Sequence, residues 1–161
     1  MKKELRVYLK ASFFACIRWA LIGAVGLTIL LGVLDSFVMG KILAYQFFER
    51  ALDCFAVLYT FDIAPCDYNR IKGKTMSEHV RKAIPSALVR AAAATVALSI
   101  QSLLTYFRWG AAFTDTFPAV AFILRVAIYY GMSFGLSFLG ELIQYHILEM
   151  IEEKKKPKAK E

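Results

Sequence analysis

Residues that build metal sites and disulfide frameworks are scarce in this chain. Its 161 residues include three cysteines and two histidines. The cysteines Cys16, Cys54 and Cys66 form no CxxC pair, so neither a disulfide framework nor a zinc site is predicted. His79 and His146 lie far apart in the sequence and offer little to a metal ion. We therefore expect no metal and no cofactor.

Apolar residues, by contrast, are abundant. They make up 58% of the chain, which is too large a share for an ordinary soluble domain. The net charge of +7 on a soluble surface would suggest nucleic acid, but here the positive residues occur in blocks beside apolar runs. That arrangement is typical of a protein oriented in a membrane. The predicted class is an all-α polytopic membrane protein with no nucleic-acid partner.

The first apolar stretch, residues 11–40, holds only two charged residues, Arg18 and Asp35. Within it, residues 19–34 are free of charged side chains, and with their neighbours they exceed the ~20 residues needed to cross a bilayer. The basic residues ahead of this stretch could indicate a signal peptide. Its length and the lack of an Ala-x-Ala spacing predict a retained anchor instead.

The last two apolar stretches are predicted to form a pair of spanning helices. The earlier one opens at Pro85, where a first helical turn tolerates proline, and runs to about Phe107. The later one opens at Pro118 and contains Gly131 and Gly135 in a GxxxG pattern. Because small residues let helices approach closely, these glycines predict a tight antiparallel hairpin with the alanine-rich partner helix.

Residues 42–64 form the least hydrophobic candidate span. Polar residues recur on one face at helical spacing, namely Gln46, Glu49, Arg50, Asp53 and Thr60. Hydropathy alone does not decide whether this stretch inserts. If it did not cross, the basic N-terminus and the basic connector after it would lie on opposite sides of the membrane. We therefore expect it to span, with its polar face turned toward protein.

Residues 65–84 are predicted to form a cytoplasmic connector that contacts anionic lipid. Thr75 and Glu78 form a capping box that opens a short amphipathic helix before Pro85. We expect His79 on its polar side and an apolar stripe on the other, which suits a membrane surface. The positive residues of the connector are Arg70, Lys72, Lys74, Arg81 and Lys82.

Residues 142–161 continue the last span beyond Glu141, the predicted inner boundary, and end in a basic tail. One apolar stripe runs along this extension beside three glutamates, and it could dock a partner or lie on the lipid surface. The stripe consists of Ile143, Ile147, Met150 and Ile151.

The charge distribution predicts the topology. Of the 20 lysines and arginines, 14 lie in residues 1–10, in the connector and in the tail. Four spans with both termini in the cytoplasm place all three segments inside, in accordance with the positive-inside rule. We thus expect a single domain, residues 1–161, in the cell's inner (cytoplasmic) membrane.

Charged residues within the spans are the natural candidates for function. Arg125 lies about 10 Å below the outer boundary and is expected to pair with Asp53 or Glu49. Arg18 and Arg90 lie nearer the inner face, where long side chains can reach the headgroups. A buried network that fixes helix packing is favoured over an ion or anion path. Its predicted members are Arg125, Asp53, Glu49, Arg50, Arg18, Arg90 and Glu141.

No catalytic residue is predicted. The motifs GxSxG, P-loop and HExxH are missing. Asp35 and Asp53 could be imagined as an aspartyl pair like that of signal peptidase II, a four-span protein of similar size. The characteristic motifs of that enzyme are absent, and Asp35 is expected well above Asp53. A small intramembrane enzyme for lipids or peptides remains one alternative, and a stand-alone small transporter is another.

The connector and its flanks resemble the small membrane subunit of TRAP transporters. In that family the connector runs from a glycine, through an acidic residue, to a Leu-Pro pair that opens the third span. Gly73, Glu78 and Ile84-Pro85 stand at similar spacing here, although the family's Trp-x-Glu-Glu approach to the second span is not reproduced. The resemblance implies a non-catalytic scaffold beside a larger transport subunit for small organic anions, with a separate binding protein outside.

Overall fold

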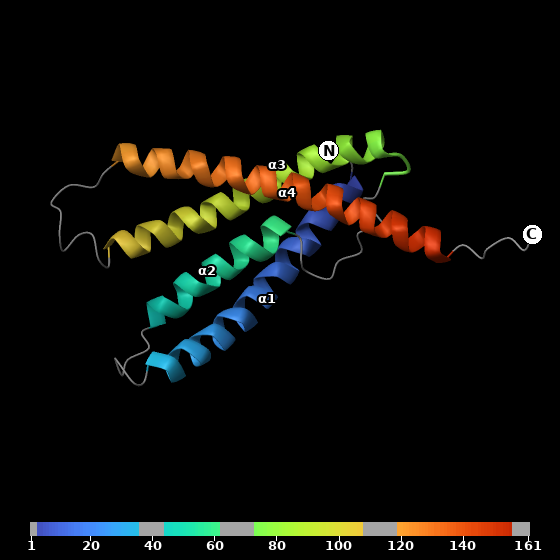
Figure 1. Ribbon diagram of the computed structural model, residues 1–161. Coiled ribbons are helices and arrows are strands. Elements are labelled where there is room, and N and C mark those ends of the chain that lie inside the picture. Colours follow the sequence, from blue (N-terminus) through green and yellow to red (C-terminus); the bar gives the residue numbers. More distant parts are fainter. Residues whose placement is uncertain (1–2, 36–43, 62–72, 108–118, 156–161) are drawn as a thin grey trace, which may run out of the picture.

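A computed structural model describes residues 3–35, 44–61, 73–107 and 119–155, and its regular elements are four α-helices (Figure 1). They are α1 (Lys3–Asp35), α2 (Ala44–Phe61), α3 (Met76–Thr105) and α4 (Ala119–Lys155). The all-helical class predicted from the sequence is confirmed. Three of the helices, α1, α3 and α4, are long and apolar enough to cross a membrane. The shorter α2 carries Glu49, Arg50 and Asp53 within its 18 residues.

The helices pack in the order α1, α2, α3, α4, and each is in extensive contact with the next. Successive helices run in opposite directions along the bundle (Figure 1). The start of α1, the end of α2, the first half of α3 and the second half of α4 therefore meet at one end. That end contains the buried side chains of Tyr8, Tyr59, Arg90 and Glu141.

Aromatic rings fill the contact between α1 and α2. Phe13 meets Phe55 edge to face at 5.3 Å and Tyr59 at 5.6 Å, while Phe55 and Tyr59 stack on each other at 5.4 Å. Cys16 is fully buried against this group. Edge-to-face and stacked arrangements stabilise such a cluster beyond the area it buries.

Small residues bring α2 and α3 together. Ala56 of α2 packs against Ala94 and Ala97 of α3, and each is at most 4% exposed. Where no large side chains separate two helices, their backbones approach closely and gain van der Waals contact. The alanine-rich middle of α3 therefore faces α2 as well as α4.

The contact between α3 and α4 does not use the predicted GxxxG pair. Ser133 and Ser137 are buried on α4, and Ser102 of α3 exchanges a hydrogen bond of 3.1 Å with the hydroxyl of Tyr129. Gly131 and Gly135 lie on the exposed side of α4, and a Cβ added at either would meet nothing within 4 Å. The antiparallel pairing is present, but the predicted role of the glycines in it is wrong. Hydrogen bonds from Ser86, His79 and Ser102 of α3 join the two helices instead.

The start of α3 follows the predicted capping box, but the helix is much longer than expected. The hydroxyl of Thr75 accepts the Glu78 backbone N–H at 3.3 Å, and the Glu78 carboxylate accepts the Lys74 N–H at 3.1 Å. The helix then runs unbroken through Pro85, so Pro85 lies inside α3 rather than at its first turn. A proline there removes one intrahelical hydrogen bond, and the packed residues on both sides of it hold the helix together.

Candidate functional site

A buried ion pair joins α3 to α4. A guanidinium nitrogen of Arg90 lies 3.4 Å from a carboxylate oxygen of Glu141, and each side chain is 1% exposed. Ser86, one turn earlier on α3, donates a hydrogen bond of 2.7 Å to the same carboxylate oxygen. A buried charge is tolerated only where a partner charge and hydrogen bonds compensate for lost water. Here α3 supplies both of these partners to Glu141.

Two tyrosines complete the surroundings of Arg90. Its guanidinium donates to the Tyr8 hydroxyl at 3.3 Å and lies over the Tyr8 ring, 5.6 Å from the centroid. It also lies 5.9 Å from the centroid of the Tyr59 ring. The electron-rich ring faces stabilise the cation, more strongly where water is excluded. The Tyr59 hydroxyl in turn donates to the Leu9 carbonyl at 3.4 Å, so Arg90 contacts α1, α2 and α4 at once.

His79 lies on the packed side of α3 and not on the polar side where it was predicted. Its side chain is fully buried, and Nε2 donates to the Glu141 backbone carbonyl at 3.2 Å. The imidazole also stacks on the ring of Tyr145, with the centroids 4.6 Å apart. The amphipathic pattern misplaced His79 because it assumed a short surface helix, whereas α4 covers the first turns of α3.

Side chains of α4 also cap the last turn of α2. Ser137 donates to the Thr60 carbonyl at 2.8 Å, and Gln144 donates to the Phe61 carbonyl at 3.1 Å. The last carbonyls of a helix have no intrahelical partner and must be satisfied elsewhere. The end of α2 is thereby fixed beside the ion pair, which lies on the same stretch of α4.

Of the predicted charge set, the structure brings Arg90 and Glu141 together. Arg90 is enclosed and does not reach toward the headgroups as expected. Arg125 and Asp53 are both exposed, and within the described part of the chain no ion pair joins Arg125 to Asp53 or Glu49. The predicted Arg125 pairing is therefore absent from the described residues.

The other predicted residues are spread over the surface or lie at other contacts. Glu49 is 7% exposed and accepts from the Thr105 hydroxyl at 3.5 Å. Arg18 is exposed, and Arg50 is half-buried. In the connector, Lys74 and Arg81 are exposed and Lys82 pairs with Glu78 at 3.0 Å, while Arg70 and Lys72 lie outside the described residues. The apolar stripe of the extension is exposed throughout, at Ile143, Ile147, Met150 and Ile151.

Sequence reasoning missed Ser86, Tyr8 and Tyr59 as partners of the buried charges. One signal could have pointed to the pair itself, because Arg90 and Glu141 both fall near the inner ends of their predicted spans. Charges at equal depth on neighbouring helices are candidates to pair. Nothing in the local sequence marks the tyrosines, which reach Arg90 from helices far away along the chain.

The buried cluster contributes to the packing of the four helices. The carboxylate and the guanidinium neutralise each other, and aromatic rings cover the cation. Among the described residues, no group of three or more His, Cys, Asp or Glu side chains is placed to hold a metal ion. A set of contacts from all four helices instead fixes their relative positions at this end of the bundle.

The whole chain was compared with known proteins for likeness in sequence and in structure. It matches no protein family, no curated protein and no solved structure. The function is therefore inferred from the residues and their arrangement.

Proposed function

We propose that this chain is a non-catalytic scaffold subunit of a larger membrane complex. The observation that carries the proposal is the course of α4 beyond Glu141. The helix continues as one element to Lys155, about 20 Å past the buried ion pair. Its apolar stripe stays exposed between Ile143 and Ile151, at 42% to 55%.

The geometry of this extension favours a protein partner over a lipid surface. An amphipathic helix that binds lipid lies in the plane of the membrane interface. The extension shares the axis of the spanning part of α4, and Figure 1 shows it continuing in line toward the C-terminus. A helix that leaves the bundle along this axis presents its stripe to a neighbouring protein. Helix-in-groove docking uses this spacing of anchors.

The exposed charges also favour a protein neighbour. Arg125 lies in α4, which is apolar enough to cross the membrane. Asp53 lies in α2, which packs against the three apolar helices. Charged side chains at membrane depth face protein or a water-filled path rather than lipid. A partner subunit would supply polar groups to both, and a stand-alone transporter would instead use them for its substrate path.

We also propose the number of membrane spans and the side on which the termini lie. Four spans, with α2 among them, would place residues 1–10, the connector and the tail together in the cytoplasm of a cell with an inner membrane. The alternating directions of the four helices support this arrangement (Figure 1). The basic residues of the three segments, Lys74 and Arg81 among them, would then face anionic lipid.

The kind of complex is inferred from the resemblance to the small subunit of TRAP transporters. The spacing of Gly73, Glu78 and Pro85 supports it, whereas the unbroken course of α3 through Pro85 replaces the separate connector helix that we expected. On this basis we place the chain beside a larger subunit that transports small organic anions.

Single substitutions on the extension test the docking surface. Ile147→Glu adds a charge to the stripe, and Glu149→Lys reverses one at an exposed position on the other side of the helix. After purification in mild detergent, Ile147→Glu should reduce the amount of the partner subunit bound per chain, and Glu149→Lys should leave it near the wild-type value. Equal binding by both variants and the wild type would show that the stripe does not dock the partner.

A further inference from the structure

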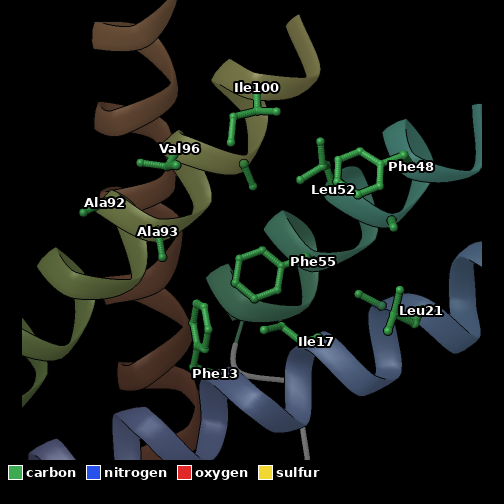
Figure 2. Close-up of a pocket in the computed structure, with 13 residues that line it drawn as sticks. Phe13, Ile17, Leu21, Phe48, Leu52, Phe55, Ala92, Ala93, Val96 and Ile100 are labelled. Atoms are coloured by element: carbon green, nitrogen blue, oxygen red, sulfur yellow. The ribbon is translucent and has the colours of Figure 1, made fainter. Parts of the chain in front are cut away.

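An apolar groove runs between α1, α2 and α3 (Figure 2). Its volume is 490 Å³, within the range of about 300 to 1,000 Å³ that is usual for small-molecule sites. The groove forms because α1 and α3 both pack on α2 but share few contacts with each other. Every side chain that lines it is apolar, among them Phe13, Leu21, Leu52, Phe55, Ala93 and Ile100.

The same side of α1 carries a row of positive charges next to the groove. Lys3, Arg6 and Lys10 precede Phe13 and Ile17 at steps of three and four residues, which places all five on one face of the helix. The three basic side chains are exposed. Lys10 lies about 4.5 Å along the helix axis from Phe13, where the groove begins. The face thus changes from basic to apolar within one helical turn.

We propose that the groove holds an acyl chain of an anionic phospholipid from the cytoplasmic leaflet, with its phosphate beside Lys10. The apolar lining matches the hydrocarbon chain, and Lys10 and Arg6 match the negative headgroup. From Phe13 to Leu21 the groove follows α1 for about 12 Å, which suits an extended chain that enters from the headgroup region. A partner helix would account for the apolar lining but not for the adjoining row of basic residues.

This site is separate from the docking stripe of α4 and from the buried ion pair. It needs insertion of α1 and α3 in a membrane but no partner subunit. A chain without a partner subunit can therefore bind lipid, and a chain with a partner subunit can lack bound lipid. The two proposals can fail independently.

Native mass spectrometry of the full chain, purified from membranes in mild detergent, tests the acyl-chain site. Ala93→Phe fills the groove from α3, and Ala127→Phe makes the same change at an exposed position of α4 outside the groove. We expect the wild type and Ala127→Phe to retain one phospholipid and Ala93→Phe to lose most of it. An unchanged lipid count in Ala93→Phe would overturn the site. Loss of a bound protein with no change in lipid would assign the groove to a partner helix instead.

A second measurement needs no substitution in the packed part of the chain. Phosphatidylglycerol with a photoactivatable group in its acyl chain is added to vesicles that contain the wild-type protein. Cross-links should concentrate on peptides that line the groove, such as the one with Leu52 and Phe55. Labelling spread evenly over the exposed sides of the helices, including Ile123 and Leu124 of α4, would contradict the proposal.

Removing the positive charge of Lys10 tests its contact with the lipid headgroup. In vesicles of phosphatidylcholine with a minority of phosphatidylglycerol, wild-type protein should retain phosphatidylglycerol preferentially. Lys10→Gln should lower that preference about fivefold, because one basic residue near the surface contributes roughly that factor. Arg125→Gln removes an exposed positive charge near the start of α4, away from the cytoplasmic segments, and should not change it. Equal preferences in wild type and Lys10→Gln would show that Lys10 does not bind the lipid headgroup.

Discussion

The carboxylate of Glu141 on α4 lies 3.4 Å from the guanidinium of Arg90 on α3, and both side chains are shielded from solvent. The two residues are 51 positions apart, so the pair fixes how α3 and α4 meet at one end of the bundle. Tyr8 and Tyr59 extend the contact to α1 and α2. A cluster that joins all four helices is expected to determine the assembly of the fold.

Breaking this ion pair from one side should destabilise the protein strongly. Arg90→Leu leaves the Glu141 carboxylate buried without its partner charge, which typically costs about 3 to 5 kcal/mol. The double variant Arg90→Leu with Glu141→Leu removes both charges and should recover much of the lost stability. Thermal unfolding in one detergent, compared among wild type, single and double variants, measures both effects.

Arg125→Leu is the matched control for that experiment. Arg125 is exposed on α4, so the same substitution there should change the unfolding temperature of the isolated chain little. If Arg90→Leu were as mild as Arg125→Leu, the pair would contribute nothing measurable. If Arg125→Leu were as severe as Arg90→Leu, Arg125 would have a buried partner that this structure lacks.

Gly73 should tolerate no side chain. A Cβ there would lie 2.3 Å from the backbone nitrogen of His79 and 2.7 Å from its Cα, so the start of α3 would have to move. Overpacking of this kind costs about 1 to 3 kcal/mol, and Gly73→Ala should lower the unfolding temperature accordingly. Gly131→Ala meets no atom and should be neutral or slightly stabilising, since alanine favours helix. A destabilising Gly131→Ala would restore the GxxxG pair as a packing contact.

Much of the helical architecture could be predicted from the sequence. Long apolar runs identified α1, α3 and α4, and the Thr75–Glu78 capping box located the start of α3 at Met76. These features succeed because they depend on local chemistry, either the hydropathy of one stretch or hydrogen bonds within one turn. The third span was predicted to start at Pro85, but Pro85 lies inside α3. A proline permits a helix to start but does not require it to.

The contacts between helices could not be predicted in the same way. The GxxxG pattern predicted the wrong face of α4 because small residues occur on several of its faces. Only the positions of the other helices decide that Ser133 and Ser137 are buried. His79 was placed among polar residues because nothing in its own helix shows that Tyr145 covers it. Which faces meet is a property of the whole bundle, and one sequence contains no record of contacts between distant positions.

Membrane topology can be measured by labelling single cysteines in intact cells, in a variant that lacks Cys16, Cys54 and Cys66. Cysteines at Lys41 and Thr114 should react with a reagent that does not cross the membrane. Cysteines at Lys74 and Lys158 should react only after the cells are opened, because the basic segments are expected inside. External labelling at Lys74 would contradict four spans, and would exclude α2 as a membrane-crossing helix.

The proposal that this chain acts as a subunit is tested most directly by the composition of the particle that contains it. The protein is extracted from its native host in mild detergent, separated by size, and its mass and stoichiometry are measured. We expect the chain in a fixed ratio with a second, larger polytopic membrane protein, and we expect Ile147→Glu with Ile151→Glu to weaken that association. A monodisperse chain without a partner, active in transport or lipid turnover when reconstituted alone, would contradict the account.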